Sequence, residues 1–191
     1  MKKMAVFASG TGSNTQKIID HFSDRTKNAT VCLIASNKQE AGVLDIAGKE
    51  NIDTLYMEKE RFFRGDGFVP EFESRQIDLI VLAGFLWKVP ITLINAYPRR
   101  IINIHPALLP KFGGKGMYGR FVHEAVLKEG EQESGITIHY VDEHYDHGAT
   151  IFQAKCSIAP HESVTTLSDK IHLLEHRHYP QVIEQVLNTI K

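Results

Sequence analysis

Unbroken apolar runs, in which no polar residue alternates with the apolar ones, constrain the fold of this chain most. In Leu79-Ile80-Val81-Leu82-Ala83, five consecutive side chains are apolar. A strand of this kind must be covered on both faces, which is typical of parallel sheets flanked by helices. Comparable runs predict five strands in the first half of the chain: Met4–Ser9, Thr30–Ser36, Thr54–Met57, Leu79–Phe85 and Arg100–His105.

Helical or turn-rich segments separate these strands, near residues 14–24, 41–51, 67–76 and 90–97. Such an alternation predicts βαβ units. The expected fold class is therefore α/β, with a mainly parallel twisted sheet and a Rossmann-like N-terminal half.

The second half of the chain has a different pattern. Gly135–Asp142 and Thr150–Ile158 read as two strands joined by a polar connection, which predicts an antiparallel C-terminal extension. A final helix is expected over Val164–Ile190, and Pro180 inside it predicts a kink or a break. Because the 191 residues contain no repeat or obvious linker, a single domain spanning residues 1–191 is expected.

Composition disfavours several classes of protein. The net charge of −1 and the pI near 6.8 give no basic surface, so no nucleic-acid partner is expected. No apolar run approaches the roughly 20 residues of a membrane span, and the N-terminal run is too short for a secretory signal. Cys32 and Cys156 lie in apolar runs and are expected to be buried free thiols. These features together predict a cytoplasmic protein.

A glycine-rich turn, Ser9-Gly10-Thr11-Gly12-Ser13-Asn14, joins the first strand to the first helix. Ser13 and Gln16 match a capping box, which places the helix start at this turn. Glycines allow close approach of an anion to the free N–H groups of the helix end, so the turn is a candidate phosphate cradle. A tight turn without a ligand is the alternative. A nicotinamide-binding turn is less favoured, because Ala35-Ser36-Asn37-Lys38 lacks the acidic residue expected after the second strand.

The run Ile101-Ile102-Asn103-Ile104-His105-Pro106 carries the most specific chemistry. Side chains alternate along a strand, so Asn103 and His105 are expected on one face at the carboxyl end of the sheet. An amide beside an imidazole suits the stabilisation of a carbonyl oxygen under attack, and the imidazole can also transfer a proton. The alternative is a buried pair that only satisfies backbone groups of a loop.

A polar connection, Asp142-Glu143-His144-Tyr145-Asp146-His147-Gly148, separates the last two strands. A carboxylate from this connection close to His105 would raise the pKa of the imidazole and favour its role as an acid near neutral pH. The alternative is a solvated turn. Neither the histidines of this region nor His172, His176 and His178 match a zinc signature, so no metal is predicted.

Several motifs together resemble one family. They are the glycine turn, Leu82-Ala83-Gly84-Phe85, Asn103-Ile104-His105-Pro106-Ala107-Leu108-Leu109-Pro110, Gly135-Ile136-Thr137-Ile138-His139, Asp146-His147-Gly148 and Glu175-His176 followed by Tyr179-Pro180. Over essentially the whole chain, the sequence resembles the glycinamide ribonucleotide formyltransferases of purine synthesis. The resemblance implies transfer of the formyl group of 10-formyltetrahydrofolate, a co-substrate, to the amine of glycinamide ribonucleotide. It implies no metal, no membrane partner and a monomer or homodimer.

The resemblance also implies roles for individual residues. The catalytic residues would be Asn103, His105 and Asp146, with Asp146 keeping His105 protonated and His139 beside them. The substrate phosphate would bind at Gly12, Ser13 and Asn14, and Glu175 would meet the ribose hydroxyls. The folate would contact Arg64, Leu86, Trp87, Lys88, Val89 and Asn103.

Three departures from the family pattern concern the pocket rim. Trp87-Lys88 stands where many relatives carry arginine and an aliphatic residue, and His147 replaces a common glycine. The connection Lys111–Arg120 is longer and richer in glycine, as expected of either a mobile lid or a variable loop. Rival functions are formyl transfer to methionyl-tRNA or a sugar amine, hydrolysis of the formyl-folate, and a binding module that uses the glycine turn alone.

Overall fold

A computed structural model describes residues 1–24, 26–64 and 66–190 of the chain, which form one seven-stranded sheet in the order β3-β2-β1-β4-β5-β6-β7. Strands β1 to β5 pair in parallel, and β6 and β7 add to the β5 edge as antiparallel strands. The predicted α/β fold with an antiparallel extension is therefore confirmed. The strands are β1 (Lys2–Phe7), β2 (Ala29–Ser36), β3 (Asp53–Tyr56), β4 (Leu79–Leu82), β5 (Ile101–His105), β6 (Glu133–Tyr140) and β7 (Thr150–Ser157).

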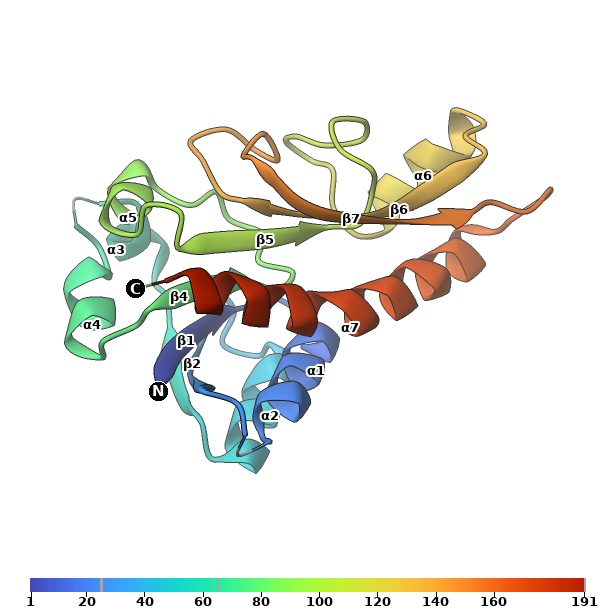
Figure 1. The fold of residues 1–191 in the computed structure, drawn as a ribbon. Coiled ribbons are helices and arrows are strands. Elements are labelled where there is room, and N and C mark those ends of the chain that lie inside the picture. The colour runs from blue at the N-terminus through green and yellow to red at the C-terminus, as the bar shows by residue number, and fades with distance from the viewer. Residues whose placement is uncertain (25, 65, 191) are drawn as a thin grey trace.

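Helices cover the sheet on both faces (Figure 1), as the unbroken apolar runs require. In β1, Met4 and Val6 belong to one apolar core, whereas Ala5 and Phe7 belong to the other. The first core includes side chains of α1 (Ser13–Phe22), α2 (Gly42–Glu50), α6 (Arg120–Lys128) and α7 (Val164–Thr189). The second core includes side chains of α3 (Lys59–Phe63), α4 (Val69–Ser74) and α5 (Ile91–Ala96).

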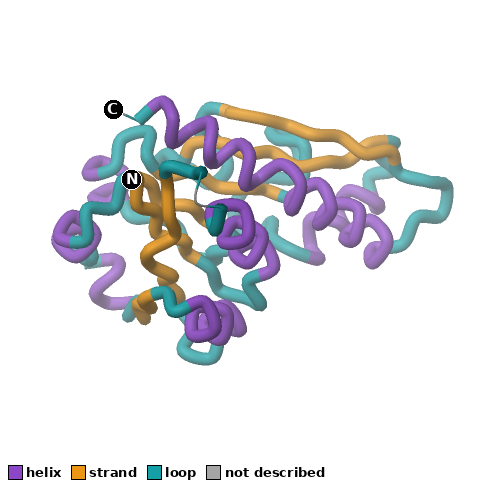
Figure 2. Tube along the Cα trace, turned by 60° about the horizontal axis from the view of Figure 1, so that its bottom comes forward, coloured by secondary structure: helices purple, strands orange, loops and turns teal. Residues whose placement is uncertain are grey.

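The long C-terminal helix α7 runs beside the antiparallel extension and continues past Pro180 (Figures 1 and 2). Of the predicted kink or break at Pro180, the break is therefore wrong. Pro180 is buried, and the hydroxyl of its fully buried neighbour Tyr179 donates a hydrogen bond to the carbonyl oxygen of Leu82 at 2.9 Å. This packing against the sheet outweighs the roughly 3 kcal/mol that an interior proline costs a helix.

Two helices, α3 and α6, are missing from the sequence prediction, and strand β4 is shorter than expected. Strand β4 ends at Leu82 because Gly84, with φ of 77°, turns the chain away from the sheet. This early turn frees residues 83–89 to line the carboxyl edge of the sheet.

Candidate active site

A cavity of about 980 Å³ lies at the carboxyl edge of the parallel strands. Its walls come from the glycine turn after β1, the segment after β4, the end of β5, the loop before α6, the β6–β7 connection and α7. Open α/β sheets bind ligands at this edge. The cavity contains most of the predicted site residues, Gly12, Ser13, Asn14, Leu86, Trp87, Lys88, Val89, Asn103, His105, His139, Asp146 and Glu175.

The glycine turn places the start of α1 at the cavity wall. Gly12 has φ of 85°, and a Cβ added to it would lie 2.8 Å from the Val43 side chain, so a larger residue does not fit. Gly12 is the N-cap and Ser13 is the first helical residue, with no side-chain cap among the described residues. The predicted capping box of Ser13 and Gln16 is therefore wrong. The first N–H groups of α1 have no partner within the helix and remain available to a ligand.

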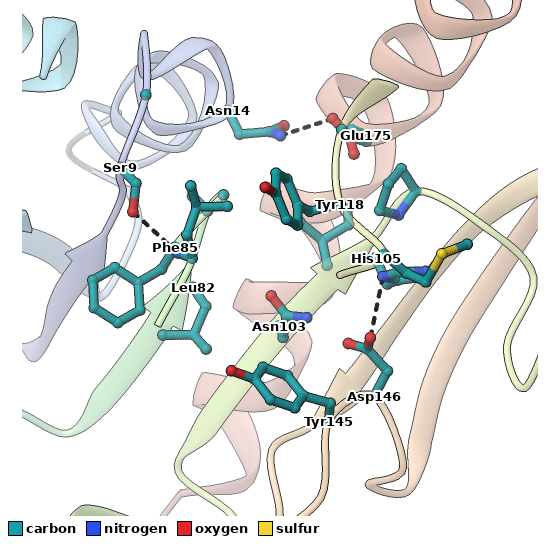
Figure 3. A pocket seen from close by; sticks show the side chains of 18 of the residues that line it. Ser9, Asn14, Leu82, Phe85, Asn103, His105, Tyr118, Tyr145, Asp146 and Glu175 are labelled. Atoms are coloured by element: carbon teal, nitrogen blue, oxygen red, sulfur yellow. Dashed lines mark hydrogen bonds and ion pairs between the residues drawn. The ribbon is translucent and has the colours of Figure 1, made fainter. Parts of the chain in front are cut away.

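Asn14 connects this turn to the far wall of the cavity. Its amide donates a hydrogen bond to Oε2 of Glu175 on α7 at 2.8 Å (Figure 3). Glu175 is 6% exposed, and burial raises the pKa of its carboxyl, although the Asn14 amide opposes the rise. The structure thus brings the predicted phosphate turn and the predicted ribose-binding carboxylate together.

Asn103, His105 and Asp146 meet on one side of the sheet, as strand alternation predicts for the first two. Oδ2 of Asp146 lies 3.6 Å from Nδ1 of His105, and Oδ1 lies 3.6 Å from Nε2 of His139. Asn103 pairs with His139 across β5 and β6, and their side chains hydrogen-bond at 3.1 Å. Asp146, which has φ of 57°, also accepts a hydrogen bond from the backbone N–H of Gly114 at 2.9 Å.

Backbone carbonyls determine the tautomers of both histidines, because a carbonyl can only accept a hydrogen bond. Nε2 of His105 lies 2.8 Å from the Phe112 oxygen, so Nε2 carries the proton of the neutral ring. Nδ1 of His139 likewise donates to the Tyr140 oxygen at 2.8 Å. The neutral His139 ring therefore accepts from the Asn103 amide through Nε2, and the second Asn103 N–H has no partner among the described residues. A second proton on His105 would sit on Nδ1, facing Asp146.

Burial and charge oppose each other at His105. Burial lowers the pKa of His105 below its ordinary value, and the raising effects of Asp146 and the Phe112 carbonyl are smaller. The Asp146 carboxylate acts in the predicted direction, but burial has the larger effect on the pKa of His105. That Asp146 keeps His105 protonated during the reaction stays a prediction. For Asp146, burial favours the neutral carboxyl, yet His139, His105 and the Gly114 N–H together hold its pKa below the ordinary value.

The predicted folate-binding segment forms an apolar wall. Trp87 packs against an aromatic group made by Phe62, Phe63 and Phe85, with ring centroids 5.5 to 6.2 Å apart. Val89 is buried, whereas Lys88 is exposed and its Nζ lies 5.9 Å from the Tyr145 ring on the opposite side of the cavity. Aromatic and aliphatic surface of this kind suits a flat heterocycle.

Arg64 is the one predicted site residue that does not line the cavity. Its side chain is 81% exposed and lies 3.9 Å from the Glu60 carboxylate. Its contact with folate stays a prediction. The loop Gly114–Arg120 does line the cavity, as do His123 and His172.

Sequence reasoning missed three contributors: the Phe112 carbonyl, the buried His123 and the hydroxyl of Ser9. A carbonyl leaves no signal in a sequence, and the roles of the two side chains depend on packing. Among the described residues, no group of three or more His, Cys, Asp or Glu side chains could hold a metal ion, and no helix is long and apolar enough to cross a membrane. Cys32 and Cys156 are free thiols away from the cavity and only partly buried.

The fold and the site together define an α/β protein with a small-molecule cavity at the carboxyl edge of its sheet, lined by an amide, imidazoles and a carboxylate. The formyl transferase family model matches residues 2–183, and the chain belongs to this family. Phosphoribosylglycinamide formyltransferase of Bacillus subtilis (strain 168) is 37% identical over 191 residues, which cover 98% of this chain and 95% of that protein.

A solved structure and two plant proteins give further comparisons. The crystal structure of phosphoribosylglycinamide formyltransferase from Bacillus halodurans superposes with a TM-score of 0.88 at 34% identity, covering 98% of this chain and 96% of that one. The chloroplastic phosphoribosylglycinamide formyltransferase of Arabidopsis thaliana is 40% identical over 95% of this chain. The chain spans only 64% of that protein and 60% of its Vigna unguiculata counterpart.

Proposed function

We propose that this protein transfers the formyl group of 10-formyltetrahydrofolate to the amine of glycinamide ribonucleotide. Relatives that carry the name of this activity support the proposal, among them the Bacillus subtilis protein. The observation that carries it is the convergence of Asn103, His105 and Asp146 in one cavity with the glycine turn and Glu175. These are the groups needed to hold a phosphorylated acceptor and to stabilise the oxygen of a formyl group.

The acceptor binds between the glycine turn and α7. N–H groups at the start of α1 bind the phosphate, where the helix dipole favours an anion. Glu175, held by Asn14 at 2.8 Å, accepts hydrogen bonds from the ribose hydroxyls. This arrangement directs the acceptor amine toward the end of β5.

The formyl-folate binds along the apolar wall of residues 86–89. Its flat rings lie against apolar surface near Trp87 and Val89, and backbone groups of the segment read the ring edge. The cavity of about 980 Å³ is at the upper end of the range for small-molecule sites, as two substrates require.

Chemistry begins when the neutral acceptor amine attacks the formyl carbon. A bond forms from the amine nitrogen to this carbon, and negative charge develops on the formyl oxygen. The Asn103 N–H that is not bonded to His139 donates to this oxygen, and the positive charge of protonated His105, which the Asp146 carboxylate favours, stabilises the developing negative charge. The carbon–nitrogen bond to folate then breaks, the amine nitrogen loses a proton and the folate nitrogen gains one.

A direct assay tests the proposal. Purified protein mixed with 10-formyltetrahydrofolate and glycinamide ribonucleotide is expected to convert the folate, followed by absorbance, and to yield the formylated acceptor, detected by mass spectrometry. Parallel reactions with a sugar amine, and with no acceptor at all, distinguish transfer to another amine and hydrolysis. Formate release at the same rate without an acceptor would contradict the proposal.

The cellular location, the partners and the oligomeric state are further parts of the proposal. We infer a cytoplasmic protein whose partners are these two small molecules and which is a monomer or a homodimer. Free thiols and the bacterial relative support the first point. Light scattering of the purified chain decides the oligomeric state, since a higher assembly would contradict both options.

A further inference from the structure

Ser9 lies two residues after β1, between the two proposed substrate sites, and it is 4% exposed. Ser9 holds the start of the apolar wall of residues 86–89, called here the folate wall, through two hydrogen bonds. The Ser9 backbone N–H donates to the Gly84 oxygen at 3.1 Å, and the Leu86 N–H donates to Oγ of Ser9 at 3.0 Å (Figure 3). Ser9 therefore fixes both ends of the turn that follows β4.

The single proton of the Ser9 hydroxyl is used elsewhere. Oγ donates it to Oδ1 of Asn37, which follows β2, at 2.6 Å. Because the hydroxyl donates to Asn37, a lone pair remains for the Leu86 N–H, and the two bonds orient each other. Asn37 does not line the cavity, and its side chain is linked to the cavity wall by the hydrogen bond to Ser9.

Ser9 also directly precedes the glycine turn Gly10–Asn14. The acceptor turn and the folate wall are thus connected through one buried hydroxyl. We propose that Ser9 is a positioning residue that holds the donor site at a fixed distance from the acceptor site. This inference rests on the proposed function, since it assigns the two walls to the two substrates. It also means that Leu86 offers the folate its carbonyl, because its N–H is already bonded.

Loss of the Ser9 hydroxyl leaves the Leu86 N–H and the Asn37 oxygen without their partner. The wall can then shift relative to the turn, and small displacements of reacting atoms are costly in a two-substrate reaction. The expected loss in kcat/KM for the formyl-folate is about tenfold, as for one buried hydrogen bond.

Trp87, the only tryptophan of the chain, reports on the wall directly. Folic acid is titrated against Trp87 fluorescence, and formyl transfer is measured, in Ser9→Ala, Asn37→Ala, Asn37→Asp and the double alanine variant. Ser134→Ala is the matched control, because Ser134 is 2% exposed and its hydroxyl has no partner among the described residues.

We expect Ser9→Ala to weaken folic acid binding and lower kcat/KM about tenfold, and Asn37→Ala to act in the same direction. Asn37→Asp keeps the acceptor and should remain within about twofold of wild type, like the Ser134 control. The double variant should lose no more than Ser9→Ala alone, because both changes break one connection. Additive losses, or wild-type folic acid binding in Ser9→Ala, would overturn the inference.

The Asn37 variants and the fluorescence readout allow the test to be interpreted even if Ser9→Ala does not fold or the protein does not transfer formyl groups. The Asn37 variants test the same connection if Ser9→Ala does not fold. Fluorescence titration requires no reaction, so protein that binds folic acid without transferring formyl groups contradicts the proposed function and leaves the Ser9 result readable.

Discussion

Asp146 faces two imidazoles at once, with one carboxylate oxygen toward His105 and the other toward His139. A single charge thus acts on the proposed acid, His105, and on the histidine that orients Asn103. The carboxylate stays ionised because its pKa is held low by these neighbours, even though burial opposes ionisation. At His105 burial has the largest effect and lowers the pKa below its ordinary value, against the raising effect of Asp146.

Replacing Asp146 by asparagine tests this balance, since Asp146→Asn nearly keeps the shape and removes the charge. The pKa of His105 should fall further, because the negative charge of Asp146, which raises it, is lost. Turnover should drop about 100-fold, the usual scale of acid catalysis. If protonated His105 is the active form, activity falls as pH rises through its pKa, so this fall should move to lower pH in the variant.

A pH profile of kcat from 5 to 8 makes the measurement, with Asp45→Asn on the exposed face of α2 as the control for charge removal. Wild-type turnover of Asp146→Asn across this range would refute the role of the carboxylate.

Period-two alternation was enough to predict that Asn103 and His105 share a face, because that relation is local to one strand. The net pKa of His105 was not predictable in this way. It depends on burial under the loop before α6 and on the Phe112 carbonyl, seven residues away. The exposed position of Arg64 likewise follows from how α3 packs, which no local pattern describes.

The loop between β5 and α6 is the element with the most unusual backbone. Gly114 and Gly116 have φ of 100° and 90°, which side-chain-bearing residues rarely adopt. The loop is tied to the proposed catalytic residues at its start, through the Gly114 N–H and the Phe112 carbonyl. Its backbone shape therefore contributes to the electrostatics of Asp146 and His105.

Gly114→Ala should disturb this shape. A Cβ at Gly114 meets no atom within 4 Å, so the cost is conformational and not a clash. Strain of about 1–3 kcal/mol is expected to shift the loop and weaken the Gly114–Asp146 hydrogen bond, lowering kcat more than stability. Gly48→Ala is the matched control. Gly48 lies exposed in α2 with equal space around it, and this change should stabilise the protein by up to about 1 kcal/mol without affecting kcat.

Urea unfolding and steady-state kinetics on both variants separate the two effects. If Gly114→Ala and wild type have equal kcat, the conformation of this loop does not contribute to the activity of the proposed catalytic residues.

Patterns in the sequence predict most helices and strands, but they do not predict where these elements end, the presence of α6 or the continuity of α7. Helix α6 follows directly on the glycine-rich loop, so only two core positions four residues apart, Val122 and Val126, mark it. Pro180 predicts a kink or a break in α7 because local propensity disfavours proline, yet the helix continues because Tyr179 and Pro180 are buried against the sheet.

At the scale of the whole molecule, the cavity joins the parallel half of the sheet to its antiparallel extension. The parallel half contributes the glycine turn and the apolar wall of residues 86–89, and the extension contributes His139 and Asp146. Building such a site buries titratable groups between the two halves. His105 and His123 are each 3% exposed, and burial lowers the pKa of both imidazoles.

This burial makes stability depend on pH between about 7 and 5. Near neutral pH, His105 and His123 are largely uncharged in both the folded and the unfolded chain. As pH falls through their ordinary pKa near 6.5, the unfolded chain takes up protons first, so unfolding becomes easier by up to about 1.4 kcal/mol per pH unit for each histidine. Glu175 opposes the trend, since its raised pKa lets the folded state take up a proton. Carboxyls with a lowered pKa, such as Asp146, act only at more acidic pH.

Urea midpoints measured at pH 7 and pH 5.5 test this dependence. Wild type should lose stability on acidification, and His123→Gln should lose less, because one buried imidazole that resists protonation is gone. The pKa of His123 is lowered by burial first and then by the charges of His172 and His105, so the variant removes a group whose protonation is disfavoured in the folded state. His144→Gln, at a 65% exposed imidazole, should keep the wild-type dependence. If His123→Gln and wild type lose the same stability on acidification, the acid sensitivity comes from other groups and the expected contribution of His123 is contradicted.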